Sequence, residues 1–200
     1  MNSLQSIAVY CGARSGNDPI YTQKAYALGR LIAEQSITLV YGGGNVGLMK
    51  AVADGCLEHN GHVIGVIPHM LKELELAHSG LHKLYTTQSM QERKMLMLQL
   101  SDAFIALPGG FGTMEEMFEA LTLTQLNYQS KPVGILNING YYDPLEQWIS
   151  HAHERGFISI NHTQLLHFST EGEDLLQKLR DAPFFSLQSE LQKDETLTKA

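Results

Sequence analysis

The stretch Ile37–Lys50, ITLVYGGGNVGLMK, decides the fold class. An apolar run rich in β-branched residues ends in three glycines, and a helical pattern follows them directly. Similar short runs, separated by longer helical patterns, occur at about 6–11, 62–67, 82–86, 102–107 and 132–137, with a weaker one near 164–168. This alternation predicts an α/β fold: a Rossmann-like, doubly wound parallel sheet with helices on both faces, in a single domain.

Length and composition bound the class of protein. With 200 residues, 44% of them hydrophobic, we expect one folded domain over 1–185 and a polar C-terminal tail over 186–200. The net charge of -7 has the wrong sign for binding a phosphate backbone, which argues against a nucleic-acid partner. No basic and apolar leader pattern and no run of roughly 18 apolar residues is present, so we expect no membrane association and a cytoplasmic location.

Several helix starts are visible as an N-cap residue followed three positions later by Glu, the spacing of a capping box. Three pairs fit this spacing: Ser89–Glu92, Thr113–Glu116 and Asp143–Glu146, the last with Pro144 at the first helical position. Asp18-Pro19 predicts the start of the first helix in a similar way. These signals set the boundaries of the expected helices.

Gly42, Gly44 and Gly47 satisfy the GxGxxG spacing between a strand and a helix. A dinucleotide site is disfavoured, because this loop follows the second strand and the next strand ends VIGVIP without an acidic residue to hold a ribose. No Gly-Lys-Ser/Thr follows, so a Walker A loop is excluded. Glycine amides and the positive end of a helix suit a single phosphate or a ribose phosphate, with Gly43 and Gly44 as expected contacts. A tight turn that only packs helix against sheet is the alternative.

The loop 108–116, PGGFGTMEE, also follows a strand, so it is expected to meet the first glycine loop at the ligand-binding edge of the sheet. Glu116 either completes a capping box or acts as a general base or as the partner of a developing cation. Arg93-Lys94 lies near a helix start and opposes the helix dipole. A bound phosphate or an acidic partner such as Glu116 would compensate these cations; two solvated surface cations are the alternative.

The helix that begins after Ser89 carries apolar residues around too much of its circumference for one buried face. They are Met90, Met95, Leu96, Met97, Leu98 and Leu100. Such a helix is expected to be covered by a partner subunit as well as by its own sheet. We therefore expect a homodimer.

Three segments together resemble the Lonely Guy (LOG) family, the cytokinin-activating phosphoribohydrolases once labelled possible lysine decarboxylases. They are GGGNVGLM at 42–49, MQERK at 90–94 and PGGFGTMEE at 108–116. The similarity extends from CGARSG at 11–16 to GYYDPL at 140–145. The PGGxGTxxE motif with its upstream Arg-Lys pair is the most specific part.

The resemblance implies a Rossmann-like homodimer that hydrolyses the N-glycosidic bond of an AMP-like or N6-modified adenosine 5′-monophosphate, with no cofactor and no metal. Arg93 and Glu116 match the family's catalytic pair, and a carboxylate suits the oxocarbenium-like state of glycosidic cleavage. Arg93 either holds the phosphate or meets the departing purine. The positions that line the family's nucleotide pocket are Glu75, Arg93, Lys94, Gly110, Phe111, Gly112, Thr113, Met114, Glu115, Glu116 and Thr122. Lys50 and Gln91 stand where the family frequently has Gly and His, which bears on the pocket and the base preferred.

Other functions remain as alternatives. Related Rossmann-like proteins carry nucleotide-like groups such as molybdenum cofactor without turnover, but a carrier does not need both Arg93 and Glu116. An NAD-dependent oxidoreductase is a weaker alternative. Lysine decarboxylation is disfavoured, because it requires pyridoxal phosphate in a large domain, and His82-Lys83 lies in or beside a predicted strand. The histidines lack a metal-ligand pattern. Cys11 and Cys56 show no CxxC spacing, and Cys11 is expected to be a small buried residue.

Overall fold

The computed structural model describes residues 4–74 and 77–183. These residues form one seven-stranded sheet in which every neighbouring pair of strands is parallel. The expected domain boundary at 185, the tail 186–200 and Glu75 lie outside the described residues. The predicted fold class is confirmed.

The strands match the expected apolar runs to within one residue at each end except at β7, which starts two residues later than expected. They are β1 (Ser6–Tyr10), β2 (Thr38–Tyr41), β3 (Val63–Pro68), β4 (Lys83–Thr87), β5 (Ala103–Ala106), β6 (Val133–Leu136) and β7 (Leu166–Ser169). Their order in the sheet is β4-β3-β2-β1-β5-β6-β7. The central strands are buried on both faces, which explains their continuous apolar sequence.

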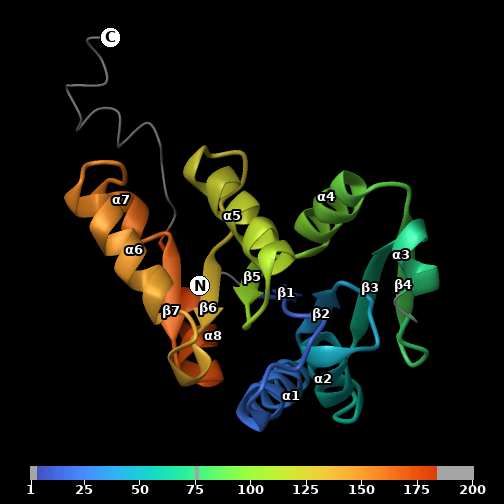
Figure 1. The fold of residues 1–200 in the computed structure, drawn as a ribbon. Helices are drawn as coiled ribbons and strands as arrows, with labels where there is room; N and C mark the ends of the chain where they lie inside the picture. Colours follow the sequence, from blue (N-terminus) through green and yellow to red (C-terminus); the bar gives the residue numbers. More distant parts are fainter. Residues whose placement is uncertain (1–3, 75–76, 184–200) are drawn as a thin grey trace.

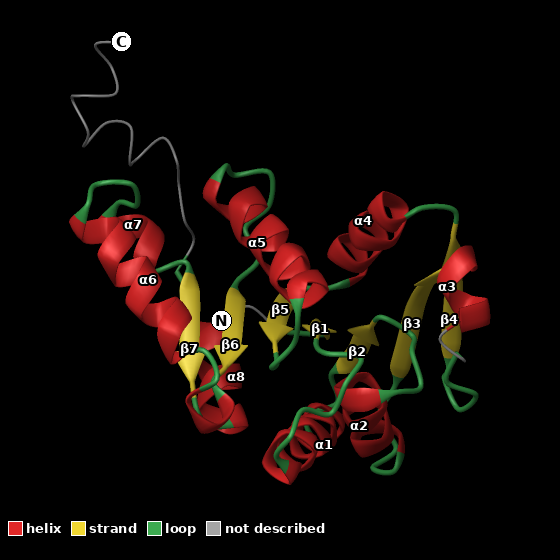
Figure 2. Ribbon diagram, in the orientation of Figure 1, coloured by secondary structure: helices red, strands yellow, loops and turns green. Residues whose placement is uncertain are grey.

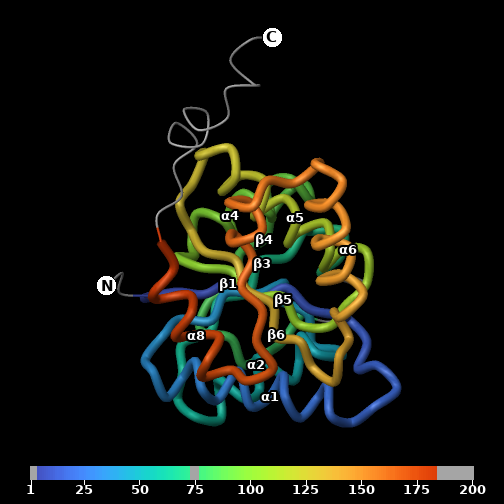
Figure 3. The backbone as a smooth tube through the Cα atoms, turned by 90° about the vertical axis from the view of Figure 1, so that its left-hand side faces the viewer, coloured from blue at the N-terminus to red at the C-terminus, as the bar shows by residue number. Residues whose placement is uncertain are grey.

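Helices cover both faces of the sheet (Figure 1 and Figure 2). They are α1 (Pro19–Glu34), α2 (Gly47–Leu57), α3 (His69–Leu74), α4 (Met90–Leu100), α5 (Phe111–Gln125), α6 (Asp143–Glu154), α7 (Ile160–Thr163) and α8 (Gly172–Asp181), with a 3-10 turn at Ile138–Gly140. One apolar core joins α1, α2 and α8 to the sheet, and a second joins α4, α5 and α6 to the opposite face. Figure 3 shows α1 and α2 on one side of the sheet and α4 and α5 on the other.

Two of the predicted helix starts are confirmed. The Asp18 carboxylate accepts a hydrogen bond from the backbone N–H of Ile20 (2.9 Å) at the start of α1. At the start of α4, the Ser89 hydroxyl accepts from the N–H of Glu92 (3.1 Å), as a capping residue does. Local side-chain chemistry therefore determines both of these helix ends.

The other two capping predictions are wrong. Gly110, not Thr113, is the N-cap of α5, because the glycines let the helix begin three residues earlier and Thr113 is buried in its first turn. Tyr142, not Asp143, is the N-cap of α6, and the Asp143 carboxylate accepts a hydrogen bond from the Asn137 side-chain amide (2.7 Å) instead. In both cases the residue that the spacing assigned to the cap lies inside the helix instead of before it.

The chain order places the topological switch point of the sheet between β1 and β5. Strands β1 to β4 run outward in one direction, and β5 to β7 run outward in the other. The loops that leave β1 and β5 therefore diverge, and ligands of open α/β sheets bind in the crevice between such loops. In this crevice the backbone N–H of Gly12 donates to the carbonyl of Pro108 (3.0 Å), so the two loops are joined at their base.

Helices α1 and α2 pack backbone to backbone through Gly29 and Gly55. A Cβ atom on Gly29 would overlap the carbonyl oxygen of Val52, and one on Gly55 would overlap the carbonyl oxygen of Tyr26. These two glycines permit the close approach of helices that together cover one face of β1 and β2.

We expect Gly29→Ala to destabilise the protein by about 3 kcal/mol, since overpacking outweighs the roughly 1 kcal/mol that alanine gains over glycine in a helix. For a domain of this size, the melting temperature should fall by about 10 °C in a thermal unfolding experiment. Arg30→Ala, at the exposed neighbouring position, serves as the control and should leave the melting temperature nearly unchanged. An unchanged melting temperature for Gly29→Ala would contradict the close helix packing.

Candidate functional site

A cavity of about 500 Å³ lies at the carboxyl ends of β1 and β5. The loops after these two strands form most of its wall, and the first turns of α2, α4 and α5 complete it. Its lining residues are Cys11, Gly12, Ala13, Arg14, Ser15, Gly16, Tyr21, Leu48, Met49, Met90, Arg93, Pro108, Gly109, Gly110, Gly112, Thr113, Glu115, Glu116 and Tyr141. The glycine loop after β5 and the helix that carries Arg93 thus line the same cavity.

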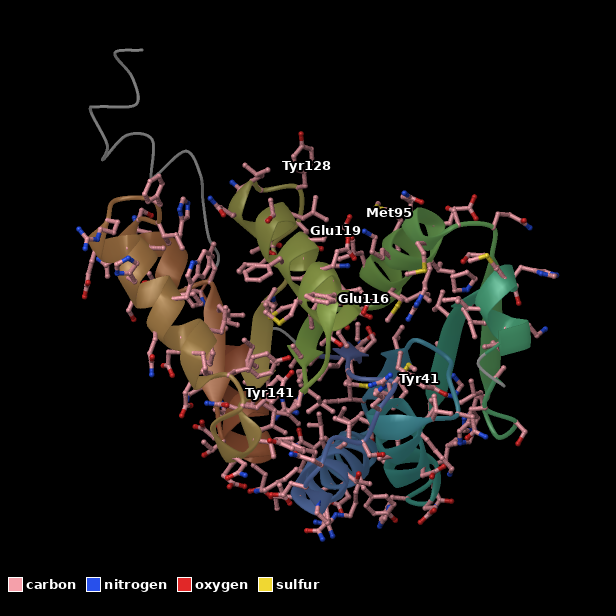
Figure 4. The ribbon with its side chains drawn as sticks, in the orientation of Figure 1. Tyr41, Met95, Glu116, Glu119, Tyr128 and Tyr141 are labelled. Carbon is pink, nitrogen blue, oxygen red and sulfur yellow. The ribbon has the colours of Figure 1, made fainter. Side chains whose placement is uncertain are left out.

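Arg93 and Glu116 face each other inside this cavity. Arg93 extends from α4 and Glu116 from the side of α5 that faces α4 (Figure 4), and Nη2 of Arg93 lies 3.4 Å from Oε1 of Glu116. Both residues are only 8% exposed. Nε of Arg93 and Oε1 of Glu116 are buried and form no hydrogen bond with the part of the chain that the structure describes. The pair therefore keeps hydrogen-bonding capacity for a bound molecule.

Burial raises the pKa of the Glu116 carboxyl, and the positive charge of Arg93 opposes this shift. Glu115 and Glu119 on the same helix raise the pKa further, whereas Lys94 lowers it. A carboxyl group whose pKa is raised in a cavity is typical of acid–base and charge-stabilising sites. The alternative that Glu116 only caps a helix is excluded by its position in the second turn of α5, facing Arg93.

The first glycine loop makes room for Arg93. A Cβ atom on Gly42 would overlap Nη2 of Arg93, so the guanidinium lies directly against this backbone. Gly47 has a positive φ of 57° and packs against Ala13, where a side chain would overlap the backbone. Through these contacts the loop supports the buried arginine and brings α2 close to the loop after β1.

Gly43 and Gly44 lie outside the lining of the cavity. The carbonyl of Gly43 accepts a hydrogen bond from the N–H of His78 (3.1 Å), and Gly44 forms an isolated bridge with Ala77. His78 in turn binds the Asp54 carboxylate through Nε2 (2.9 Å), which fastens this segment to α2. The predicted contact of Gly43 and Gly44 with a substrate stays a prediction.

The start of α5 opens onto the cavity. A Cβ atom on Gly110 or Gly112 would meet no atom within 4 Å among the described residues, whereas one on Gly109 would overlap the Thr113 hydroxyl. The first amides of a helix have no partner within it, so they are available to an anion. Phe111 is 98% exposed and Met114 packs against the core, so of the expected stretch 110–116 these two do not line the cavity.

Lys94 pairs with acidic residues beside the cavity instead of lining it. Its ammonium group contacts the carboxylates of Glu115 and Glu119 (3.2 Å to Glu119) on α5. These contacts raise the pKa of Lys94 against the opposing effect of burial. Lys94 thereby joins α4 to α5 across the site, and its predicted role in substrate binding stays a prediction.

Two further residues that were singled out from the sequence lie away from the cavity. Thr122 is exposed and lines a separate apolar groove between α5 and α6, with Phe118 and Trp148. Lys50, which departs from the family pattern, forms an ion pair with Asp54 one turn further along α2. This departure therefore does not alter the lining of the cavity.

Sequence reasoning missed several lining residues, chiefly Arg14, Tyr21, Met49 and Tyr141. Arg14 follows Gly12 at the end of β1, a position whose glycine did point to the ligand edge. Tyr21 and Tyr141 are distant in the sequence but pack edge to face, with ring centroids 6.0 Å apart. No local sequence pattern predicts that Tyr21 and Tyr141 meet, because only the fold brings α1 and the start of α6 together.

Cys11 is half-buried and lines the cavity, so the prediction of a simple buried residue is only partly correct. Burial strongly raises the pKa of its thiol, and the nearby Glu116 carboxylate adds to the shift. The thiol therefore stays protonated and is a poor nucleophile. Its role in the site is that of a small wall residue.

The described residues contain neither a cluster of metal-ligand side chains nor a membrane-spanning helix. Within 4–74 and 77–183, no group of three or more His, Cys, Asp and Glu side chains is placed to hold a metal ion. None of the helices in the described part of the chain is long and apolar enough to cross a membrane. Lys83, the candidate pyridoxal lysine, lies on β4 over the ring of Tyr85 and does not line the cavity.

The sheet order defines a Rossmann-like α/β protein, and the ion pair lies at its switch point, where proteins of this class bind ligands. Residues 49–179, more than half of the chain, match the family described as "Possible lysine decarboxylase". The chain belongs to this family, the LOG family that its motifs resemble.

Two relatives show the extent of the similarity. The cytokinin riboside 5′-monophosphate phosphoribohydrolase of Rhodococcoides fascians is 48% identical over 156 residues, which cover 78% of this chain and 79% of that protein. The cytokinin riboside 5′-monophosphate phosphoribohydrolase LOG of Oryza sativa subsp. japonica is 41% identical over 178 residues, covering 89% of this chain and 74% of that protein. Both alignments are long enough to include the Arg93 and Glu116 segments.

Solved structures support the fold. The molybdenum cofactor carrier protein of Chlamydomonas reinhardtii superposes with a TM-score of 0.68 at 20% identity, over 88% of this chain and 96% of that chain. The molybdenum cofactor binding protein of Rippkaea orientalis gives a TM-score of 0.66 at 24% identity, over 88% of this chain and 95% of that chain. At these identities the likeness concerns the architecture alone.

Proposed function

We propose that this protein is a phosphoribohydrolase that cleaves the N-glycosidic bond of AMP-like or N6-modified adenosine 5′-monophosphates, releasing the free base and ribose 5-phosphate. The observation that carries the proposal is the buried pair of Arg93 and Glu116, 3.4 Å apart in the same cavity as the open start of α5. The names of relatives at 41% and 48% identity support it.

In the proposed reaction, the 5′-phosphate binds the free amides at the start of α5, beside Thr113. This anchors the ribose so that C1′ lies near Glu116, and binding free energy from the phosphate is used to orient the reacting bond. As the bond from C1′ to the base nitrogen breaks, its electron pair leaves with the base and positive charge develops on the ribose. The ionised Glu116 stabilises that charge and orients the water that adds to C1′.

Arg93 has two tasks in this mechanism. Its charge favours the ionised form of the buried Glu116 carboxylate, because it opposes the rise in pKa that burial causes. Its unpaired Nε can donate a hydrogen bond to the phosphate or to the departing purine. Water supplies one proton to the base and hydroxide to C1′, so the reaction balances without a cofactor or a metal.

A non-catalytic carrier of a nucleotide-like group is the second candidate, because molybdenum cofactor carrier and binding proteins share this architecture. A carrier function does not explain the buried ion pair of Arg93 and Glu116, since a protein that only binds a nucleotide needs no carboxylate beside the sugar.

Chromatography of the purified protein incubated with AMP, N6-isopentenyl-AMP and the two matching nucleosides separates these functions. We expect free base and ribose 5-phosphate from the monophosphates only, since the nucleosides cannot use the anion site. Binding of the monophosphates without release of base would favour the carrier.

We also infer a homodimer. Met95 is 50% exposed and Tyr128 is 80% exposed, and Figure 4 shows both on the outer side of α4 and α5. Thr122 is exposed outside the cavity, which suits a residue that lines the nucleotide pocket of a second subunit. Light scattering at micromolar concentration should give twice the mass of the chain, and a monomer would refute the inference.

Charge and cysteine chemistry support a proposal for the cellular context. The net charge of -7 disfavours nucleic acid as a partner. Cys11 and Cys56 are free thiols, which suits the reducing cytoplasm. We therefore propose that the protein acts on a small-molecule nucleotide in the cytoplasm.

A further inference from the structure

Three consecutive backbone carbonyls in the loop after β5 accept hydrogen bonds from outside that loop. Two of the donors are tyrosine hydroxyls from neighbouring residues, and the third is a backbone N–H from the loop after β1. The bonds are Tyr142 Oη to the Leu107 carbonyl (2.8 Å), Gly12 N–H to the Pro108 carbonyl (3.0 Å) and Tyr141 Oη to the Gly109 carbonyl (2.6 Å). This loop leads directly into the open start of α5.

The Gly109–Gly110 peptide is the part of the loop that most needs such a restraint. Neither residue has a Cβ atom, so rotation of this peptide meets little steric resistance. In a planar trans peptide, the C=O of one residue and the N–H of the next point in opposite directions. The bond from Tyr141 to the Gly109 carbonyl therefore also sets the direction of the Gly110 N–H. If the peptide turned over, a carbonyl oxygen would replace that donor and repel an anion.

The segment that carries the two tyrosines is itself rigidly held. The buried Asn137 accepts a hydrogen bond from the N–H of Tyr142 (2.8 Å) and donates one to the Asp143 carboxylate (2.7 Å). Positive φ angles at Asn139 (52°) and Gly140 (69°) close the turn between them. The ring of Tyr141 packs edge-on against Tyr142, with centroids 4.9 Å apart, and lies near the carboxyl end of β5 (Figure 4).

We propose that Tyr141 is a positioning residue for phosphate recognition, which holds the Gly109–Gly110 peptide in the orientation that presents the Gly110 amide to an anion. The proposal rests on the proposed function, in which the start of α5 takes the 5′-phosphate. Tyr142 differs from Tyr141, because the peptide after Leu107 ends in the nitrogen of Pro108, which has no hydrogen to redirect. Tyr142 is therefore a structural support and Tyr141 the residue that sets an amide donor.

Tyr141→Phe tests the proposal, since it keeps the ring and removes the hydroxyl. Isothermal titration calorimetry with AMP, ribose 5-phosphate and adenosine measures binding without turnover. We expect the Kd values of AMP and ribose 5-phosphate to rise together by about tenfold, the size of one charge-assisted hydrogen bond, and the Kd of adenosine to stay within about twofold. If wild type hydrolyses AMP, its KM should rise by a similar factor with little change in kcat.

Tyr26→Phe is the matched control. The Tyr26 hydroxyl also donates a hydrogen bond of 2.6 Å, to Glu58 on the surface of α1 and α2, and neither residue lines the cavity. Its loss should leave all three Kd values unchanged. Tyr142→Phe should lower the melting temperature more than Tyr141→Phe does, while its affinity for ribose 5-phosphate stays closer to that of wild type.

Two results would overturn the role of Tyr141. Unchanged affinity for ribose 5-phosphate in Tyr141→Phe would show that the hydroxyl does not organise the anion site. Equal weakening of AMP and adenosine would show that Tyr141 contacts the base or the sugar. Failure of the proposed function is visible separately, because wild-type protein would then bind AMP and ribose 5-phosphate but release no base.

Discussion

Glu116→Gln should reduce the release of base from AMP by about a thousandfold or more, while AMP still binds with an affinity within a few fold of wild type. Glutamine has the size and shape of glutamate, so the cavity keeps its geometry. It carries no negative charge, so it cannot stabilise the positive ribose of the transition state or take a proton from water. Losses of roughly 10² to 10⁴ are typical when a charge-stabilising or general-base group is removed.

The measurement is single-turnover cleavage of AMP followed by chromatography, with binding determined separately by calorimetry. Glu119→Gln is the control, because Glu119 lies on the same helix, is more exposed and pairs with Lys94 outside the cavity (Figure 4). It should retain activity within about twofold. If Glu116→Gln cleaves AMP at a rate within tenfold of wild type, Glu116 has a purely structural role.

Arg93→Met should lower activity by about a hundredfold at neutral pH and move the acidic limb of the pH profile to higher pH. Burial raises the pKa of Glu116 and the Arg93 charge is the largest effect that lowers it, so its removal raises the pKa further. Because the ionised carboxylate is the active form in our mechanism, activity should recover partly as the pH is raised. The dependence of kcat/KM on pH between about 5 and 9 measures this shift.

Arg93→Met should also lower the stability of the folded protein, by an amount that depends on pH. The folded-state pKa of Glu116 lies above its unfolded-state pKa, so ionising this carboxyl lowers the free energy of unfolding. This loss of stability is complete at pH values above the folded-state pKa and absent at pH values below the unfolded-state pKa. Without Arg93 this cost increases, and breaking a buried ion pair typically destabilises by about 3–5 kcal/mol. The loss of melting temperature should therefore be larger at pH 7.5 than at pH 5. Arg155→Met, at an exposed position after α6, should show neither effect, and a pH-independent loss for Arg93→Met would contradict the coupling.

Local sequence patterns predicted the elements of this fold well. The seven strands follow from apolar runs, since both faces of a parallel sheet are buried, and two helix starts follow from Asp18 and Ser89. The patterns failed at Thr113 and Asp143, where the capping spacing is present but both residues lie inside the helix. A spacing of three residues describes one helical turn, and it does not reveal whether the first residue lies before the helix or within it.

For the site, the sequence by itself determined the residue types and their edge of the sheet: glycine loops after strands, an Arg-Lys pair and Glu116 within the PGGxGTxxE motif. Only the tertiary structure decided which of them meet. Arg93 reaches Glu116 because α4 and α5 pack side by side on one face of the sheet, and Gly42 makes room for the guanidinium from a third segment. Gly43, Gly44, Lys94 and Thr122 lie outside the cavity, and Tyr141 enters it, for the same reason. The chemical type of each side chain can be read from the sequence one residue at a time. Which side chains lie close together depends on strand order and helix packing, which no short pattern contains.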